Sequence, residues 1–522
     1  MSDLRYPTGG SALGRSASPV PAPDSVPAPD SRPAPDSRPG DLACHDPGHD
    51  PGHEGGREPD GDDRRVVLIG ASVRAAAESA RRGGFRVLAV DRFGDVDTLQ
   101  AAEWWLPVDH LRPAFPAPHS WRGAPAIVCG GLAGGERHPT DGAAVAPLPA
   151  DIRILGPTAD VRDRLRSPRE LSRLAIDAGV DFPAYVEPTA GGSRWADMPG
   201  ENARWLWKDR QGSGGLGVRW ANAAEEPGRG GYRQRWVSGR ACGATFLGDG
   251  RQARLLGVCR SLFVRSGAAR SRGAAASPDD AYAPATAADR PFVYAGSFGP
   301  VSLPQAIRRP IASLGQLAAR RFGLRGLFNA DFIVASCPIA GPRVWFLEIN
   351  PRWSGSSELI EMAWPQAVAE LTGAGPPDAA DSPPPGLAFS ADRNPRSLFR
   401  LHWQFLAARC QLPRKDAPPG GDQAEERRGD GLSRIAGPPR PGDPPRFWKR
   451  IVFATRPGHV RHDRLKPRGD RAGGTDWRLG DIPHDGQFIG RGEPIATLIG
   501  ESTGVTPRSI RHQIRRVREA VV

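Results

Sequence analysis

The stretch that opens with Val66 constrains the fold of this chain more than any other. Val66 to Ile69 is an apolar run of strand length, Gly70-Ala71-Ser72 has the composition of a tight turn, and Val73 to Arg82 is an alanine-rich helical stretch. A second apolar run, Phe85 to Val90, then ends in Asp91. A strand, a helix and another strand in this order predict a parallel βαβ unit, which is the start of a doubly wound domain.

Residues 1 to 63 have a different composition. Three copies of the unit PAPDS begin at Pro21, Pro27 and Pro33, and a tract rich in His, Gly, Asp and Pro follows. Such a segment cannot bury enough apolar surface to offset the entropy of ordering it, so we predict a disordered tail. His-rich tracts can chelate a metal, but Pro and Gly give these candidate ligands no fixed geometry, which favours a solvated tail; the candidates are Cys44, His45, His49 and His53.

The rest of the chain divides into four segments. A strand at Ala126 to Val128 extends the first, Rossmann-like domain, which we place at residues 64–155. A helix from Thr158 to Ala178, followed by strands with glycine-rich turns, predicts an α+β domain over residues 156–375. Residues 376–445 have the composition of a linker with one short helix, Ser397 to Ala408, and residues 446–522 predict a small β-rich module with a basic C-terminal helix.

The charge distribution and the cysteine pattern limit which kinds of partner and which compartment are expected. The chain has 522 residues and a net charge of +12, and only four of its 70 basic residues are lysine. Because the arginines are spread over every segment and not gathered into one stripe, a nucleic-acid partner is not favoured. The six cysteines form no CxxC pair, and no apolar run is long enough for a membrane span, so we expect a cytoplasmic protein without a membrane partner.

Lys208 ends an apolar strand and is followed by a glycine-rich loop that contains Gly212, Ser213, Gly214, Gly215 and Gly217. A cation beside several exposed backbone N–H groups can close over a triphosphate. Three of the glycines also match GxGxxG, but the strand-like Val218 to Ala221 follows where a dinucleotide site needs a helix. The pattern therefore predicts a lid over phosphates, although a plain glycine hairpin would have the same sequence.

Asp331, Glu348 and Asn350 lie in two strand-like segments, NADFIV and WFLEIN. On neighbouring strands Asp331 and Glu348 can point to the same face, and Asn350 shares that face by strand alternation. Two carboxylates and an amide oxygen suit Mg²⁺ or Mn²⁺, which also bind phosphate oxygens and water. Arg352, just beyond the strand, is placed to hold a phosphoryl group. The competing interpretation, an ordinary solvated strand face, has to explain a glutamate between two apolar residues.

These motifs resemble the ATP-grasp superfamily, specifically its carboxylate-amine ligases. The resemblance extends from about residue 64 to residue 375, with Asp331 and the stretch FLEINPR as its most specific part. It implies a nucleotide lid made of Lys208 and residues 212–217, metal ligation by Asp331, Glu348 and Asn350, and phosphate binding by Arg352. It also implies a hinge whose backbone meets adenine, at Gln234, Arg235, Trp236 and Val237, and a second phosphate-side cation at Arg164.

The chain departs from the family pattern at two positions. The hinge usually carries a carboxylate near the position of Arg235, where this chain has a base. Many ligases have an arginine two residues before the first metal ligand, where this chain has Asn329. Arg325 or Arg260 are the candidates to supply that charge.

The fold that the resemblance implies is α/β and α+β: an ATP-grasp core with an N-terminal Rossmann-like preATP-grasp domain and a small C-terminal β-rich module. The implied activity uses ATP and Mg²⁺. The γ-phosphoryl group passes to a substrate carboxylate, an amine attacks the acyl phosphate, and ADP and phosphate leave. Similar stand-alone ligases include tyramine-glutamate ligase of methanofuran synthesis, which suggests coenzyme biosynthesis, and many relatives form dimers.

Two other functions stay open from the sequence. A nicotinamide-dependent oxidoreductase is suggested by Val66 to Ser72 and by Asp91, which lies near where a ribose-binding acid would be, but the turn has one glycine where three are wanted. The second alternative is a protein that binds ATP without turnover. A misplaced Arg352 or metal ligand would favour it, but these residues all stand at the positions that the family motif requires.

Overall fold

The computed structural model describes most of the chain after the N-terminal tail. The described residues are 64–108, 119–130, 153–188, 204–221, 230–264, 291–337, 341–363, 397–407, 445–465, 477–502 and 507–522. The predicted tail, with Cys44 and its neighbouring histidines, and most of the predicted linker lie outside them. Among the helices of the described residues, none is long and apolar enough to cross a membrane.

The first domain contains the predicted parallel sheet, with strand order β3-β2-β1-β4-β5. Strand β1 (Arg65–Ile69) pairs in parallel with both β2 (Arg86–Asp91) and β4 (Pro125–Val128). Because the chain moves to the other side of β1 after β3, a ligand crevice is expected at the carboxyl ends of β1 and β4. The other elements are α1 (Arg74–Arg82), α2 (Val96–Ala101), β3 (Trp104–Pro107), a 3₁₀ turn (His119–Trp121) and β5 (Arg153–Ile154).

The helix expected from Thr158 to Ala178 is two helices, α3 (Ala159–Leu165) and α4 (Pro168–Ala178). Ser167 caps α4, and its hydroxyl accepts the Glu170 N–H at 3.4 Å. Pro168 lacks an N–H and occupies the first helical position. Serine followed by proline is favoured at a helix start, so the pair breaks an otherwise continuous helical pattern.

Two antiparallel sheets form the next domain. The small sheet has the order β6-β9-β7-β8, and the large sheet has the order β14-β13-β10-β11-β12-β15-β19-β17. The small-sheet strands are β6 (Tyr185–Val186), β7 (Trp205–Asp209), β8 (Val218–Trp220) and β9 (Gly231–Arg235). The large-sheet strands of this domain are β10 (Arg240–Asp249), β11 (Ala253–Phe263), β12 (Tyr294–Gly299), β13 (Arg325–Cys337) and β14 (Gly341–Asn350).

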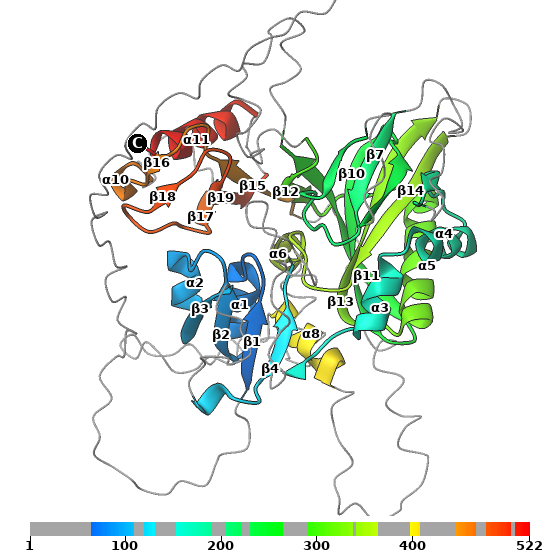
Figure 1. Ribbon diagram of the computed structural model, residues 1–522, viewed down its shortest axis with the longest axis horizontal. Coiled ribbons are helices and arrows are strands. Elements are labelled where there is room, and N and C mark those ends of the chain that lie inside the picture. The colour runs from blue at the N-terminus through cyan, green and yellow to red at the C-terminus, as the bar shows by residue number, and fades with distance from the viewer. Residues whose placement is uncertain are drawn as a thin grey trace, which may run out of the picture. The chain divides into compact units, whose positions relative to one another are not determined.

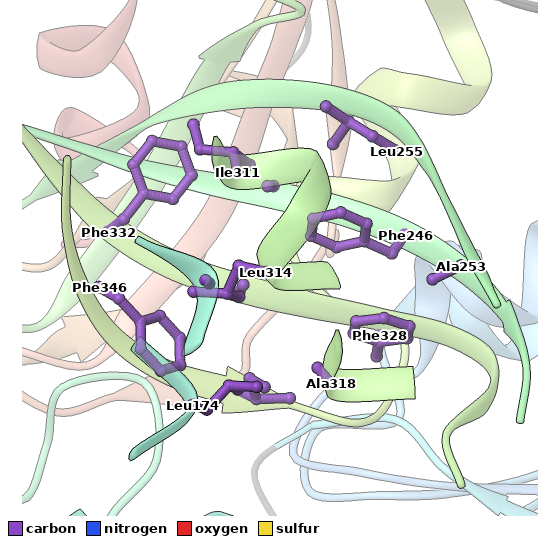
Figure 2. Packing of buried hydrophobic residues seen from close by; sticks show 14 of the residues in the cluster. Leu174, Phe246, Ala253, Leu255, Ile311, Leu314, Ala318, Phe328, Phe332 and Phe346 are labelled. Atoms are coloured by element: carbon purple, nitrogen blue, oxygen red, sulfur yellow. The ribbon is translucent and has the colours of Figure 1, made fainter. Parts of the chain in front are cut away.

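Helices α4 and α5 (Gln305–Phe322) cover one face of the large sheet (Figure 1). Under them, Phe246 of β10 and Phe328 of β13 stack with ring centroids 5.0 Å apart, and Leu314 of α5 lies among these rings (Figure 2). Gly315 lets α5 approach Phe246, since a Cβ at that position would overlap the ring. With this face filled by apolar side chains, the polar residues of β13 and β14 are left on the opposite face.

The C-terminal strands continue the same large sheet. β12 pairs with β15 (Phe447–Phe453), β15 with β19 (Pro494–Glu501), and β19 with β17 (Trp477–Gly480), all antiparallel. Residues 446–522 therefore share backbone hydrogen bonds with the preceding domain. The remaining elements are α6 (Ser357–Ala363), α8 (Leu398–Ala407), β16 (Gly458–His459), α10 (His462–Leu465), β18 (Phe488–Ile489) and α11 (Pro507–Glu519).

Candidate nucleotide and metal site

Asp331 and Glu348 lie directly opposite each other on β13 and β14. A register shift falls between Asp331 and Phe332, next to this pair. It resets the side-chain alternation of β14, so Phe346 and Ile349 both lie in the helix-covered core while Glu348, between them, faces the other way. Strand alternation alone would have put Phe346 and Glu348 on one face, so the bulge is what aims the glutamate at Asp331.

The two carboxylates are electrostatically unequal. Burial, and next the charge of Glu348, raises the pKa of Asp331 to about 7. The ammonium group of Lys208 lowers the pKa of Glu348, to whose Oε2 atom the Lys208 Nζ atom donates at 3.1 Å. Arg352 and Lys208 both lower the pKa of Asp331, yet burial and Glu348 keep it raised, so a further cation beside the pair would be stabilised.

Two asparagines hold Asp331. The Nδ2 atoms of Asn329 and Asn350 donate to its two oxygens at 2.7 and 2.8 Å. The Oδ1 atom of Asn350 accepts from Arg352. The metal-ligand role predicted for Asn350 therefore needs its amide turned by half a rotation, which exchanges oxygen and nitrogen.

The residues at this position fit a magnesium ion. The Oδ1 atom of Asn329 is buried and has no hydrogen-bond partner within the described ranges. On β10 below it, a Cβ at Gly243 would lie 3.1 Å from both Asn329 and Asp331, so the glycine keeps room for these polar groups. An unpaired amide oxygen beside two carboxylates is an all-oxygen donor set, which hard divalent cations prefer.

Lys208 reaches the carboxylates from the small sheet. It pairs with Tyr232 across β7 and β9, and its Nζ atom lies 5.8 Å from the centre of the Tyr232 ring. Burial lowers the pKa of Lys208, but Tyr232 and Glu348 raise it by more, so the pKa lies above its usual value and the amine stays charged. Lys208 thereby joins the small sheet to the large one at the site.

The glycine loop lies against Arg352 and the start of β12. The Ser213 hydroxyl accepts from Arg352 Nη2 at 2.9 Å, and the Tyr294 N–H donates to the Gly214 carbonyl at 2.9 Å. Gly214 and Gly215 have φ angles of +62° and +81°, and a Cβ at Gly215 would overlap the Phe292 carbonyl oxygen. Only glycine fits this path without strain, so these positions allow the loop to close over the site.

The predicted hinge uses part of its backbone internally. The N–H groups of Arg235 and Trp236 donate to the carbonyls of Ala184 and Arg204, each at 2.8 Å. Gln234 is 2% exposed, shares a face of β9 with Tyr232, and its Nε2 atom has no partner among the residues described. For a bound base, the hinge thus offers the Gln234 amide and the backbone from Val237 onward, and not the two preceding N–H groups.

Three of the predicted arginines do not reach the carboxylates. Arg164 lies over the Phe322 ring at 5.0 Å and 3.7 Å from Glu170, on the helical side. Arg325 pairs with Asp249 at the far end of β13, six residues before Asp331 and therefore about 20 Å away along the strand. Arg260 pairs with Cys242, whose side chain lies in the helix-covered core on the other face of the sheet.

Arg166, two residues after Arg164, is the arginine of this segment that contacts the glycine loop. Its Nη1 atom donates to Gln211 of the glycine loop at 2.6 Å. Burial lowers its pKa. The break between α3 and α4 at Ser167 turns this arginine toward the loop. The Ser-Pro pair that directly follows Arg166 is the sequence feature that could have predicted this direction.

Asp91 is not available to a ribose. Its carboxylate accepts from the Val73 N–H at 3.2 Å, the Gly94 N–H at 2.9 Å and Trp105 Nε1 at 2.8 Å, and the residue is 0% exposed. The position that suggested a nicotinamide cofactor is therefore occupied by the domain's own donors.

Comparison with known proteins finds one family model and several solved structures that are similar to parts of this chain. Residues 171–356 match the family model described as ATP-grasp domain, and no curated protein matches the chain. The biotin carboxylase-β,γ-ATP complex of Campylobacter jejuni superposes with a TM-score of 0.50 at 12% identity, over 84% of this chain and 87% of that chain.

Two other solved structures are similar at lower TM-scores. The biotin carboxylase domain of the Hydrogenobacter thermophilus 2-oxoglutarate carboxylase, in complex with MgADP, ADP and bicarbonate, gives 0.49 at 14% identity over 84% of this chain and 86% of that chain. Phosphoribosylamine–glycine ligase of Thermotoga maritima gives 0.46 at 14% identity over 88% and 97%. Residues 171–356 thus match an ATP-grasp domain model and the chain has the ATP-grasp fold, which confirms the expected fold class.

Proposed function

We propose that this protein is an ATP- and magnesium-dependent ligase that joins a carboxylate to an amine through an acyl phosphate and releases ADP and phosphate. The observation that carries the proposal is the convergence of Lys208, Arg352 and the Asp331–Glu348 pair under a closed glycine loop, within an ATP-grasp domain. The similar biotin carboxylase of Campylobacter jejuni is a complex with a β,γ-ATP ligand. A nucleotide is therefore the expected first ligand.

The chain's own residues can assist phosphoryl transfer in three ways. Lys208 can exchange Glu348 for a phosphate oxygen and neutralise charge that develops on the transferred group. Arg352 presents a planar guanidinium suited to phosphate. Its bond to Ser213 couples the closed loop to that guanidinium, and a closed loop keeps water from the acyl phosphate.

Asp331, Glu348 and the amide oxygens of Asn329 or Asn350 would hold magnesium, which supplies charge neutralisation on the phosphates when bound. Gln234 would orient the base. The expected partners are a small carboxylate and a small amine, with tyramine and glutamate the first pair to try. A cytoplasmic homodimer completes the proposal, and sedimentation of the full chain tests the dimer.

The decisive experiment mixes the purified chain with Mg-ATP and pools of carboxylates and amines, and follows ADP and phosphate release in wild type and in Glu348→Gln. Amine-dependent ADP release that is lost in the variant supports the ligase. Glu103→Gln is a matched control, because Glu103 is exposed and pairs only with Arg86 in the described chain.

Two other outcomes of this experiment would argue against the ligase. Mg²⁺-dependent ATP binding without turnover in any pool would favour a nucleotide-binding protein that performs no ligation. Absence of ATP binding in the wild type would refute the proposal.

A further inference from the structure

A buried cluster of charged side chains, which we call the junction cluster, joins the first domain, α6 and the C-terminal strands. Arg74, 1% exposed at the start of α1, donates to both oxygens of Glu358 at 2.6 and 3.1 Å. Asp481, which follows β17, lies 3.3 Å from the same guanidinium and accepts from the Ser72 hydroxyl at 2.9 Å. The cluster holds five carboxylates and three cations: Glu78, Asp95, Asp97, Glu358 and Asp481, with Arg74, Lys449 and Arg478.

Asp95 is the unpaired carboxylate of this cluster. It is 5% exposed and occupies the N-cap position of α2, where its backbone carbonyl accepts the Leu99 N–H, but its carboxylate accepts no helix N–H and has no hydrogen bond or ion pair within the described residues. Burial, and next the charge of Asp481, raises its pKa to about 8. A buried carboxylate without a hydrogen-bond donor or a counter-charge costs free energy. A cationic ligand beside Asp95 would supply both and so lower that cost.

Asp481 lies near Asp95, because the Val96 N–H, next to Asp95, donates to the Ile482 carbonyl, next to Asp481, at 2.8 Å; the backbone of Asp481 is left-handed. Its φ angle is +53°, and no other non-glycine residue in the described ranges has a positive φ. Asp97 fixes it by accepting its N–H at 2.8 Å. Its side chain is 25% exposed and Ser72 is exposed, so solvent reaches both acceptors.

A short stretch of backbone connects the junction cluster to Arg352, the arginine proposed to bind phosphate. The Ala71 N–H donates to the Gly130 carbonyl at 3.1 Å, and a Cβ at Gly130 would lie 3.5 Å from Arg352 Nε. Ser72, the next residue, already contacts Asp481. These contacts run along the carboxyl edge of β1 and β4, where a doubly wound sheet presents its ligand crevice.

We propose that Ser72, Asp95 and Asp481 bind a cationic group of the amine substrate, separate from the nitrogen that attacks. This inference rests on the proposed ligase function. The attacking nitrogen must be neutral, whereas neighbouring carboxylates stabilise the protonated form, so the group held here is a non-reacting ammonium or guanidinium. The amine substrate is then a diamine or an amine with a second basic group, and not tyramine, which has only one.

The test compares 1,4-diaminobutane with butylamine, which lacks the second charge, by calorimetric titration into the full chain with Mg²⁺ and a non-hydrolysable ATP analogue. Wild type should bind the diamine at least about tenfold more tightly, equivalent to about 1.4 kcal/mol. Asp95→Asn and Asp481→Asn should each remove this preference. Asn tolerates positive φ, so Asp481→Asn keeps its backbone. Asp485→Asn, in the same exposed segment, should keep the preference.

Equal affinities of wild type for the two amines, no binding of either, or a preference that survives Asp95→Asn would overturn the subsite. Titration of the nucleotide analogue alone separates this failure from failure of the ligase. A chain that binds no nucleotide contradicts the ligase itself, whereas a chain that binds nucleotide without distinguishing the amines contradicts only the subsite.

Discussion

The site cluster, made of Lys208, Asp331 and Glu348, and the junction cluster differ in how completely their charges are paired. In the site cluster Glu348 has a side chain 42% exposed and one lysine as its ion-pair partner. In the junction cluster Glu358 is 5% exposed and is held by Arg74 at 2.6 Å, Lys449 at 3.3 Å and Arg478 at 2.9 Å. Burial raises the pKa of Glu358, but these cations lower it by more, so the pKa falls well below its usual range.

This difference in pairing indicates that the site cluster serves binding, whereas Glu358 and its cations serve folding. A carboxylate with one exchangeable partner can turn to a metal or a phosphate-bound cation at small cost. A carboxylate enclosed by three cations cannot, and it fixes the elements that supply them. We therefore expect substitutions in the first cluster to cost activity, and substitutions at Glu358 to cost stability.

The largest effect on stability is expected for Glu358→Gln. It would leave Arg74 and Lys449 buried without their main counter-charge, and loss of one partner of a buried pair costs about 3–5 kcal/mol. Thermal and urea unfolding of the full chain measure this loss. Glu103→Gln is the control, since its pair with Arg86 is half exposed, and exposed pairs contribute about 1 kcal/mol or less. Equal melting temperatures for the two variants would remove the distinction between the clusters.

The largest effect on activity is expected for Glu348→Gln. Loss of one charged group at a site of phosphoryl transfer typically lowers turnover by about 10²–10³. The melting temperature should change little, because relief of the repulsion with Asp331 offsets the loss of the Lys208 ion pair. Steady-state ADP release together with thermal unfolding gives both numbers. A variant that unfolds early would mean that the site cluster also serves folding.

His402 is a buried group that is neutral in the folded protein, and its effect on the pH dependence of stability can be compared with that of the two charged clusters. Its Nδ1 atom accepts the Leu327 N–H at 2.8 Å, and burial lowers its pKa from 6.5 to about 3. Since the folded pKa lies below the unfolded one, its contribution is complete above pH 6.5 and declines as the pH falls toward 3.

Between pH 6.5 and 5, wild type should lose about 2 kcal/mol more unfolding free energy than His402→Gln, at about 1.4 kcal/mol per pH unit. Urea unfolding of both proteins at the two pH values measures the difference. Parallel losses would indicate that the clusters, and not this histidine, govern acid stability.

The smallest effect is expected for Ser213→Ala, which removes the hydroxyl that Arg352 contacts at 2.9 Å. One such hydrogen bond contributes about 0.5–1.5 kcal/mol, so the KM for ATP should rise by about two- to tenfold. The melting temperature should not change, because the loop keeps its backbone bond to Tyr294. An unchanged KM would show that loop closure does not depend on this contact.

Several parts of the site could be predicted from local pattern. The βαβ unit, the Lys208 loop and the Asp331–Glu348 pairing each involve adjacent elements, so composition and strand periodicity are informative about them. The side-chain direction of arginines was not predictable in this way. The resemblance implied Arg164, whereas the Ser167-Pro168 break turns Arg166 to the loop, and Arg325 lies at the far end of a strand that is longer than its apolar core.

The donor types at the site and the glycines that let a loop close could be identified from the sequence because they depend on residue chemistry and near neighbours, and the ATP-grasp fold class followed from the resemblance of the motifs to that superfamily. Only the tertiary structure decided that β15 extends the large sheet from β12, and that Arg74, Glu358 and Asp481 meet. Those partners are separated by hundreds of residues, and each looks like an ordinary surface charge in its own segment. Their burial follows from long-range strand pairing, which local periodicity does not encode.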